Sequence, residues 1–203
     1  AQSLSKGHMN IVALILGDVR NPFYADLAFR IQQILNNQGY MVMTLNSEYN
    51  IERELEFLGL TEQFNFAGLI LITAQEEKIE EKLKTMDIPK VLVNRILPSY
   101  KGDSVLIDNF QAGYQATMHL IELGHRRIVG VFKSDDTQGQ QRHKGYVQAL
   151  QEAGIAYDPD KVIWFYTEDR KTHPFERIRQ MAKDRGNHPF EAVVAYNDQV
   201  AIE

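Results

Sequence analysis

Short apolar runs alternate with amphipathic segments along almost the whole chain. The first run, residues 11–16, is continuous and rich in β-branched side chains, as expected for a strand buried on both faces. In the next segment the apolar residues fall on one helical face. Asn21 suits the N-cap of that helix, Pro22 its first turn and Gly39 the position just past its end. The pattern therefore predicts a strand followed by a helix.

The same alternation continues to the end of the chain and predicts parallel sheets. Further strands are expected at residues 40–45, 67–73, 90–94, 104–107, 127–132, 162–166 and 192–196. Helices between strands imply right-handed crossovers. We therefore predict an α/β fold of two Rossmann-like lobes, each a parallel sheet flanked by helices. The rhythm pauses at residues 95–102, so we expect a first lobe at 10–107 and a second at 108–203.

The second predicted lobe is small. It has only three expected strands, and the chain stops at Glu203, where a helix is beginning. We expect this lobe to be incomplete and the chain to be truncated or a fragment of a longer protein.

Composition narrows the classes of function. The chain has 203 residues, a net charge of −5 and no cysteine. The negative charge disfavours direct binding to phosphate backbones, and the lack of cysteine removes disulfides and thiolate metal sites. No apolar run approaches the ~20 residues that span a bilayer, and no signal peptide is visible. These features fit a cytoplasmic protein, although a mature exported protein would also lack a signal.

Enzyme motifs are absent from the sequence. It has no G-x-G-x-x-G after the first strand, no phosphate-binding P-loop and no G-x-S-x-G elbow. The six histidines show no H-x-x-x-H spacing. Residues 134–139 hold two carboxylates, which we interpret as a helix N-cap rather than a metal loop. We expect no metal, no cofactor and no catalysis.

Polar and aromatic side chains follow several predicted strands. In open α/β sheets the carboxyl ends of the strands are where ligands bind. Amide, carboxylate, guanidinium and aromatic groups together suit a polyhydroxylated ligand, because hydroxyls need donors and acceptors and a ring covers the apolar face of a sugar. The candidate residues are Asn21, Phe23, Tyr24, Asp108, Asn109, Arg142, Asn197 and Asp198.

Each candidate also has a purely structural interpretation. Asn21 and Asn109 would serve equally as helix caps. The aromatic pair Phe23 and Tyr24 would serve as core or interface residues. A lone arginine on a helix, such as Arg142, is usually solvated. The pair at 197–198 would simply begin a helix.

Five segments, taken in order, resemble one known family. They are residues 21–27 (NPFYADL), 106–113 (LIDNFQAG), 124–131 (GHRRIVGV), 142–150 (RHKGYVQAL) and 196–203 (YNDQVAIE). Together they resemble the effector-binding domain of LacI/GalR-type transcriptional repressors. The resemblance covers essentially the whole chain.

The resemblance implies a periplasmic-binding-protein-like fold of type I, with a sugar-like effector in the cleft between two lobes. It implies that Phe23 and Tyr24 line this cleft, that Arg142 makes charge-assisted contacts and that Asn197 reaches in from the second lobe. An acidic residue beyond the end of this chain would complete the site. The family also implies a homodimer that binds operator DNA through an N-terminal domain absent here.

Two segments refine this interpretation. Residues 131–142 are most similar to arabinose-responsive repressors, which suggests arabinose among pentoses and related sugars. Residues 1–9 resemble a hinge to a DNA-binding domain, in which Ala1 and Leu4 fit an A-x-x-L pattern and Leu4 would insert into the minor groove. The alternative for this end is a cloning scar at "GHM". The hinge interpretation argues against the winged-helix domain of arabinose-type repressors.

The sequence thus predicts the ligand-binding and dimerisation domain of a repressor. A solute-binding protein of a sugar transporter and a small α/β enzyme acting on a sugar or nucleotide are the alternatives.

Overall fold

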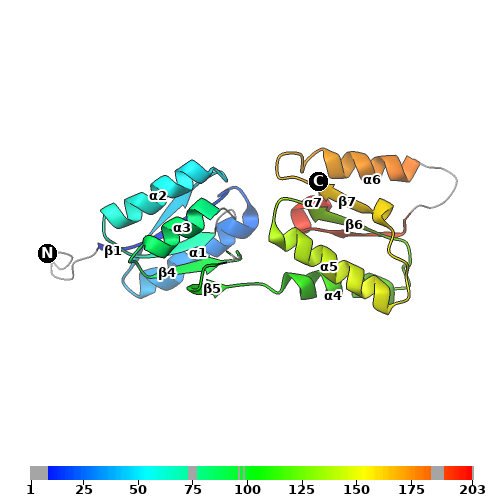
Figure 1. Cartoon of the computed structure of the whole chain (residues 1–203), viewed down its shortest axis with the longest axis horizontal. Helices are drawn as coiled ribbons and strands as arrows, with labels where there is room; N and C mark the ends of the chain where they lie inside the picture. Colours follow the sequence, from blue (N-terminus) through cyan, green and yellow to red (C-terminus); the bar gives the residue numbers. More distant parts are fainter. Residues whose placement is uncertain (1–8, 73–76, 96, 98, 184–189, 203) are drawn as a thin grey trace. The chain divides into compact units, whose positions relative to one another are not determined.

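The structure, a computed structural model, describes residues 9–72, 77–95, 97, 99–183 and 190–202. The chain divides into two compact units, Ala1–Ile107 and Asp108–Glu203, which are described separately. Each unit contains one parallel sheet with helices on both faces (Figure 1), so the predicted α/β fold is confirmed. The expected hinge residue Leu4 lies outside the described residues. Met9, which we expected in the linker, instead begins the first strand because its backbone N–H donates to the Asn65 carbonyl (2.8 Å).

The first unit contains a five-stranded parallel sheet in the order β2-β1-β3-β4-β5. The strand β1 lies between two neighbours, which explains its continuous apolar run. The elements of this unit are β1 (Met9–Leu16), α1 (Pro22–Asn37), β2 (Met41–Asn46), α2 (Ile51–Gln63), β3 (Phe66–Ile72), α3 (Glu77–Thr85), β4 (Lys90–Val93) and β5 (Asp103–Val105).

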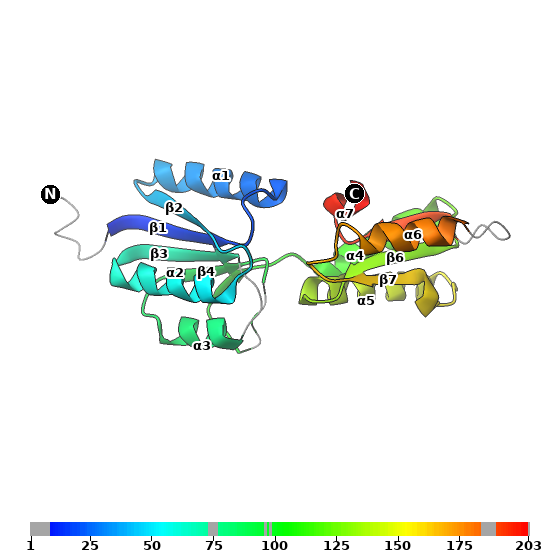
Figure 2. The ribbon, with the colours of Figure 1, turned by 90° about the horizontal axis from the view of Figure 1, so that it is seen from above.

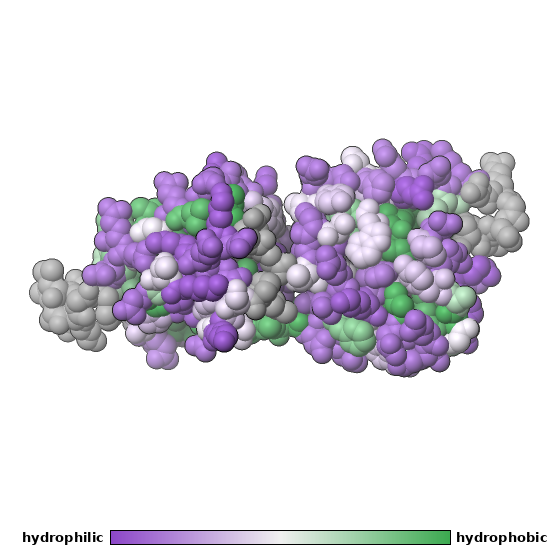
Figure 3. All heavy atoms as spheres, viewed as in Figure 1, coloured by the Kyte–Doolittle hydropathy of each residue, from purple (hydrophilic) through white to green (hydrophobic). Residues whose placement is uncertain are grey.

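Helices cover the two faces of this sheet unequally (Figure 2). Among the described residues, α1 is the only helix on one face, where Leu14 and Leu16 meet Tyr24. Helices α2 and α3 share the other face, where Leu58 and Leu83 are fully buried. The outer surface over α2 and α3 is mainly hydrophilic (Figure 3), because most of their charged side chains are exposed, although Glu54 and Glu80 are buried.

The second unit contains a three-stranded parallel sheet in the order β7-β6-β8. Helices α4 and α5 pack on one face of it, and α6 and α7 on the other. The elements are α4 (Asn109–Glu122), β6 (Ile128–Lys133), α5 (Thr137–Glu152), the 3-10 helix η2 (Pro159–Lys161), β7 (Val162–Phe165), α6 (His173–Lys183), β8 (Ala192–Ala195) and α7 (Asp198–Ile202).

Two glycines let α4 and α5 approach each other closely. A Cβ on Gly113 of α4 would lie 2.1 Å from the Arg142 carbonyl oxygen. A Cβ on Gly145 of α5 would lie 2.0 Å from the Phe110 carbonyl oxygen and 2.6 Å from the Tyr114 nitrogen. No side chain fits at such distances, so the backbones of the two helices are in direct contact.

Capping residues and glycine set helix ends at positions that the sequence predicts. Asn21 caps α1, and Gly39 just past that helix has a left-handed φ of 83°. Asp136 caps α5, as the interpretation of residues 134–139 as a helix start requires. Within the described residues, no helix is both long and apolar enough to span a membrane.

Several strand boundaries differ from the prediction by one or two residues. The strand expected at 104–107 is β5, which ends at Val105, because its pairing with β4 stops there and the next two residues are exposed. Because the cap at Asp136 starts α5 at Thr137, Arg142 lies in the second turn of that helix.

Candidate functional site

The strand order of each sheet reverses beside its first strand. In the first unit β1 lies between β2 and β3, and in the second unit β6 lies between β7 and β8. Such switch points open a crevice at the carboxyl ends of the strands, where ligands bind in α/β proteins. Most of the predicted ligand residues follow these strands, so each unit has its own candidate cluster.

The aromatic pair of the first unit divides into an exposed and a buried member. Phe23 is 49% exposed, whereas Tyr24 is only 7% exposed and belongs to the core under α1. Their rings meet edge to face with centroids 5.4 Å apart. The Asn21 side chain caps α1 by accepting from the Phe23 N–H (3.0 Å). Phe23 is therefore the member of this group that can cover a ligand, and Asn21 and Tyr24 support it.

Two residues that the sequence analysis missed join this cluster. The Arg95 guanidinium is buried and donates from Nη2 to the Tyr24 hydroxyl (3.5 Å). The Tyr49 ring packs over Gly17, where a Cβ would lie 2.2 Å from a ring carbon. Burial raises the pKa of Tyr49, and the neighbouring Tyr24 has a smaller effect in the same direction. Both residues follow strands of the same sheet, so extending the strand-end rule to every strand would have found them.

The loop that carries Tyr49 is strained. Glu48 and Tyr49 have φ values of 55° and 58°, in the left-handed region that side chains other than glycine avoid. Such a conformation persists only where the surroundings enforce it.

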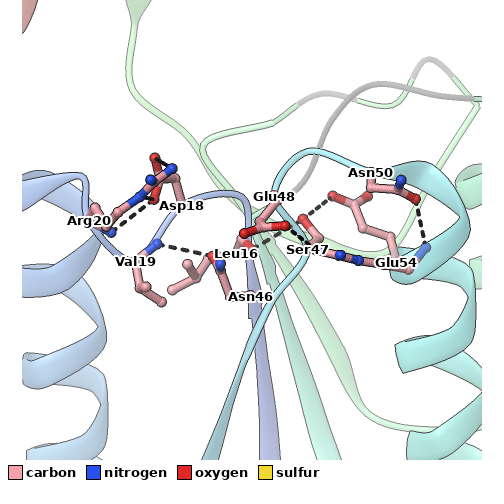
Figure 4. A network of polar contacts seen from close by, with 10 residues as sticks. Leu16, Asp18, Val19, Arg20, Asn46, Ser47, Glu48, Asn50 and Glu54 are labelled. Atoms are coloured by element: carbon pink, nitrogen blue, oxygen red, sulfur yellow. Dashed lines mark hydrogen bonds and ion pairs between the residues drawn. The ribbon is translucent and has the colours of Figure 1, made fainter.

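A buried hydrogen-bond network beside Glu48 and Tyr49 holds this loop in its left-handed conformation (Figure 4). The Ser47 hydroxyl lies 2.9 Å from Glu54 Oε1 and 3.2 Å from the Leu16 carbonyl oxygen, and both Ser47 and Glu54 are fully buried. The Val19 N–H donates to Asn46 Oδ1 (3.1 Å), which joins the loops after β1 and β2. These hydrogen bonds join the loops at the carboxyl edge of the first unit to one another.

Arg142 of the second unit is not a solvated side chain. Its Nε donates to Asn109 Oδ1 (2.9 Å), and its Nη1 donates to the backbone carbonyl of Tyr196. The guanidinium carbon also lies 4.8 Å from the centroid of the Tyr196 ring. Contacts with two other segments thus fix the arginine at the switch point of this sheet.

The remaining predicted residues of this unit lie at helix starts. Asp108 caps α4 by accepting from the Gln111 N–H (2.9 Å), so the cap is Asp108, whereas Asn109 contacts Arg142. Asn197 Oδ1 accepts from the Val200 N–H (3.0 Å) at the start of α7. Asp198 Oδ1 accepts from the Gln199 N–H (3.0 Å).

Two aspartates complete the edge of the second unit. Asp136 Oδ1 accepts from the Gly139 N–H (2.7 Å), and its Oδ2 lies 3.2 Å from Lys133 Nζ. Burial opposes ionisation of Asp135, but hydrogen bonds from Thr167 and the charge of Lys133 outweigh it and lower the pKa of Asp135. In the described part of the chain, no group of three or more histidine, cysteine or acidic residues could hold a metal ion.

Each cluster can thus bind hydroxyl groups. The second unit offers a fixed guanidinium beside amides and carboxylates, and the first offers an exposed ring beside a buried arginine. This mixture of donors, acceptors and aromatic surface suits a small polyhydroxylated molecule.

Known proteins share both sequence and fold with this chain. Residues 9–203 match the family described as periplasmic binding proteins and sugar binding domain of LacI family. The arabinose metabolism transcriptional repressor of Halalkalibacterium halodurans is 31% identical, over 98% of this chain and 55% of the repressor. The HTH-type transcriptional regulator DegA of Bacillus subtilis is 28% identical, over 99% of this chain and 60% of the regulator.

Solved structures agree with these matches. The crystal structure of transcription regulator CcpA of Lactococcus lactis has a TM-score of 0.82 and 28% identity, and the match covers 96% of this chain and 70% of that one. The chain spans less than two thirds of the length of either curated relative. All three similar proteins are named as regulators of transcription rather than as enzymes. The resemblance to LacI/GalR-type repressors is thereby confirmed, and the chain belongs to the family of periplasmic binding proteins and sugar-binding domains of LacI type.

Proposed function

We propose that this chain is the effector-binding and dimerisation domain of a LacI-type transcriptional repressor, and that its effector is a small sugar. One observation carries the choice of site: Arg142 is fixed by Asn109 and Tyr196 at the switch point of the second sheet. A guanidinium held in this way can donate charge-assisted hydrogen bonds to ligand hydroxyls without first losing side-chain freedom.

The remaining predicted residues receive roles from their positions. Phe23 covers the apolar face of the sugar, and Asn21 and Tyr24 hold it in place. Asp108, Asn197 and Asp198 contribute hydrogen-bonding groups while they cap α4 and α7. A pentose such as arabinose fits the proposal, since the relative from H. halodurans is named for arabinose metabolism.

The effector acts on transcription by shifting a conformational equilibrium. It binds one conformation of the homodimer more tightly than another and so changes the affinity for operator DNA, which a separate DNA-binding domain contacts. A coupling free energy of roughly 1–3 kcal/mol suffices for such regulation. This role needs no catalysis and places the protein in the cytoplasm.

Titration calorimetry of Arg142→Ala in the full-length protein tests the site. With L-arabinose and a panel of other pentoses and hexoses, the loss of charged hydrogen bonds should weaken binding about 10- to 100-fold. Lys144→Ala is the matched control, because Lys144 is exposed on the same helix and its loss should leave the affinity unchanged. An unchanged affinity for Arg142→Ala would show that the site is wrong.

A solute-binding protein of a sugar transporter is the second candidate, since the matching family includes periplasmic binding proteins. Binding of the full-length protein to DNA in a sugar-dependent manner would favour the repressor. Sugar binding without any DNA binding would favour the transporter component.

A further inference from the structure

Tyr196 contacts Arg142 in two ways and is itself anchored at its hydroxyl. We propose that Tyr196 is a positioning residue, which holds the Arg142 guanidinium in the orientation that binds the effector. The inference rests on the proposed role of Arg142 in sugar binding. The strand pattern predicts Tyr196 at the end of a strand and assigns it no role in binding.

The first link is between the tyrosine ring and the guanidinium. The Arg142 guanidinium carbon lies 4.8 Å from the Tyr196 ring centroid, well within the distance of a cation–π interaction. Arg142 Nη1 also donates to the Tyr196 backbone carbonyl. One residue therefore supports the guanidinium with its side chain and restrains it with its main chain.

The second link fixes the tyrosine. Its hydroxyl donates to Asp136 Oδ2 (2.8 Å) and lies 3.0 Å from Gln138 Oε1. Asp136 and Gln138 are both buried, and the Tyr196 ring also meets the edge of Phe165, with centroids 5.8 Å apart. The ring is thus held at its hydroxyl end and along its side.

The third link joins this anchor to the helix that carries the arginine. The Asp136 carboxylate caps α5 through the Gly139 N–H while its other oxygen accepts from Tyr196. The carboxylate that sets the start of α5 therefore also sets the position of the ring beside Arg142.

These contacts use only some of the N–H donors of the Arg142 guanidinium. Arginine has five N–H donors. Among the described residues, Asn109 takes Nε–H and the Tyr196 carbonyl takes one Nη1–H, which fixes the plane of the group. The directions of the other donors are therefore set before a ligand binds, so ordering the side chain does not weaken binding.

A double-mutant cycle in the full-length protein tests the proposal. Tyr196→Leu and Arg142→Ala are made singly and together, and the affinity for L-arabinose is measured by titration calorimetry. We expect Tyr196→Leu alone to weaken binding about 10-fold and to have no further effect once Arg142 is alanine, because the tyrosine acts through the arginine. Tyr196→Phe keeps the ring, so it should recover most of the affinity that leucine loses. Tyr157→Leu removes an exposed tyrosine of the same unit, whose hydroxyl lies 3.2 Å from His143 Nε2, and should leave the affinity unchanged.

The melting temperature of the same variants provides a readout without ligand. If Tyr196 and Arg142 interact, the fall in Tm caused by Tyr196→Leu should be smaller when Arg142 is already alanine. Additive effects on both affinity and Tm would overturn the proposal while leaving the role of Arg142 intact. If Arg142→Ala leaves the affinity unchanged, the proposed site is wrong, and if no sugar binds, the proposed function fails. In either case the Tm cycle alone decides whether Tyr196 positions the arginine.

Discussion

At the residue scale, His143 lies in an aromatic environment directly beside the proposed ligand arginine. Its ring centroid lies 4.8 Å from that of Trp164 and 5.4 Å from that of Phe132, and its Nε2 lies 3.2 Å from the Tyr157 hydroxyl. Burial lowers the pKa of His143, because the charged imidazolium is poorly solvated there.

This burial predicts a pH-dependent stability. The folded-state pKa of His143 is below the unfolded value of 6.5, so the unfolded chain takes up the proton first as the pH falls. The stabilisation that results from burying neutral His143 is complete above pH 6.5. It is lost as the pH falls from 6.5 toward the folded-state pKa. Urea unfolding at about pH 7.5 and at about pH 5 should therefore show a smaller drop in the free energy of unfolding for His143→Phe than for wild type. Equal drops in the two proteins would contradict this assignment.

At the element scale, the contact between α4 and α5 depends on glycine. A methyl group on Gly145 would meet backbone atoms of α4 at 2.0 and 2.6 Å, and backbone cannot move aside as a flexible side chain can. We expect Gly145→Ala to lower the free energy of unfolding by about 1–3 kcal/mol through overpacking. It should also weaken sugar binding, because a displaced α4 would move Asn109 away from Arg142. Urea titration and calorimetry measure the two effects.

A second helical glycine is the control. In the described part of the chain, no heavy atom outside the neighbouring backbone of α2 lies within 4 Å of where a Cβ on Gly59 would be placed. Gly59→Ala should raise the free energy of unfolding by about 0.5–1 kcal/mol, because alanine favours the helix and restricts the unfolded chain. The same substitution in two helices should thus have opposite signs. If both variants lose stability equally, the close approach of α4 and α5 is not the cause.

The sequence predicts elements better than it predicts contacts between them. The strand and helix pattern and the caps at Asn21 and Asp136 follow from periodicity and local hydrogen bonding, which act within a few residues. The Asp136–Tyr196 contact joins residues 60 positions apart. Nothing local distinguishes Tyr196 from a strand residue, so only the fold shows that it faces Arg142. The sequence predicts Arg142 as one of eight candidate ligand residues and does not single it out.

At the scale of the whole molecule, the two units differ in how completely their sheets are packed. The first sheet has five strands and the second only three, with β8 at an edge. An apolar pocket of about 340 Å³ lies over that edge between α6 and β8, lined in part by Ile178, Val193 and Val200. Side chains around such a space lack contacts on one side, and the second sheet is also the smaller, so we expect the second unit to be less stable than the first.

Fluorescence can follow the second unit by itself. Trp164 in β7 is the only tryptophan of the chain, whereas far-UV circular dichroism reports the helices of both units. We expect the fluorescence transition in urea to have a lower midpoint than the transition followed by circular dichroism. Coincident transitions would instead show that the two units unfold as one cooperative system.

The glycine contact between α4 and α5 also has an evolutionary consequence. A side chain at Gly113 would displace the backbone of Arg142 itself, and one at Gly145 would displace the helix that carries its partner Asn109. Neither glycine has a side chain with which to touch a ligand. We therefore expect relatives that bind an effector through this arginine to have glycine at both positions.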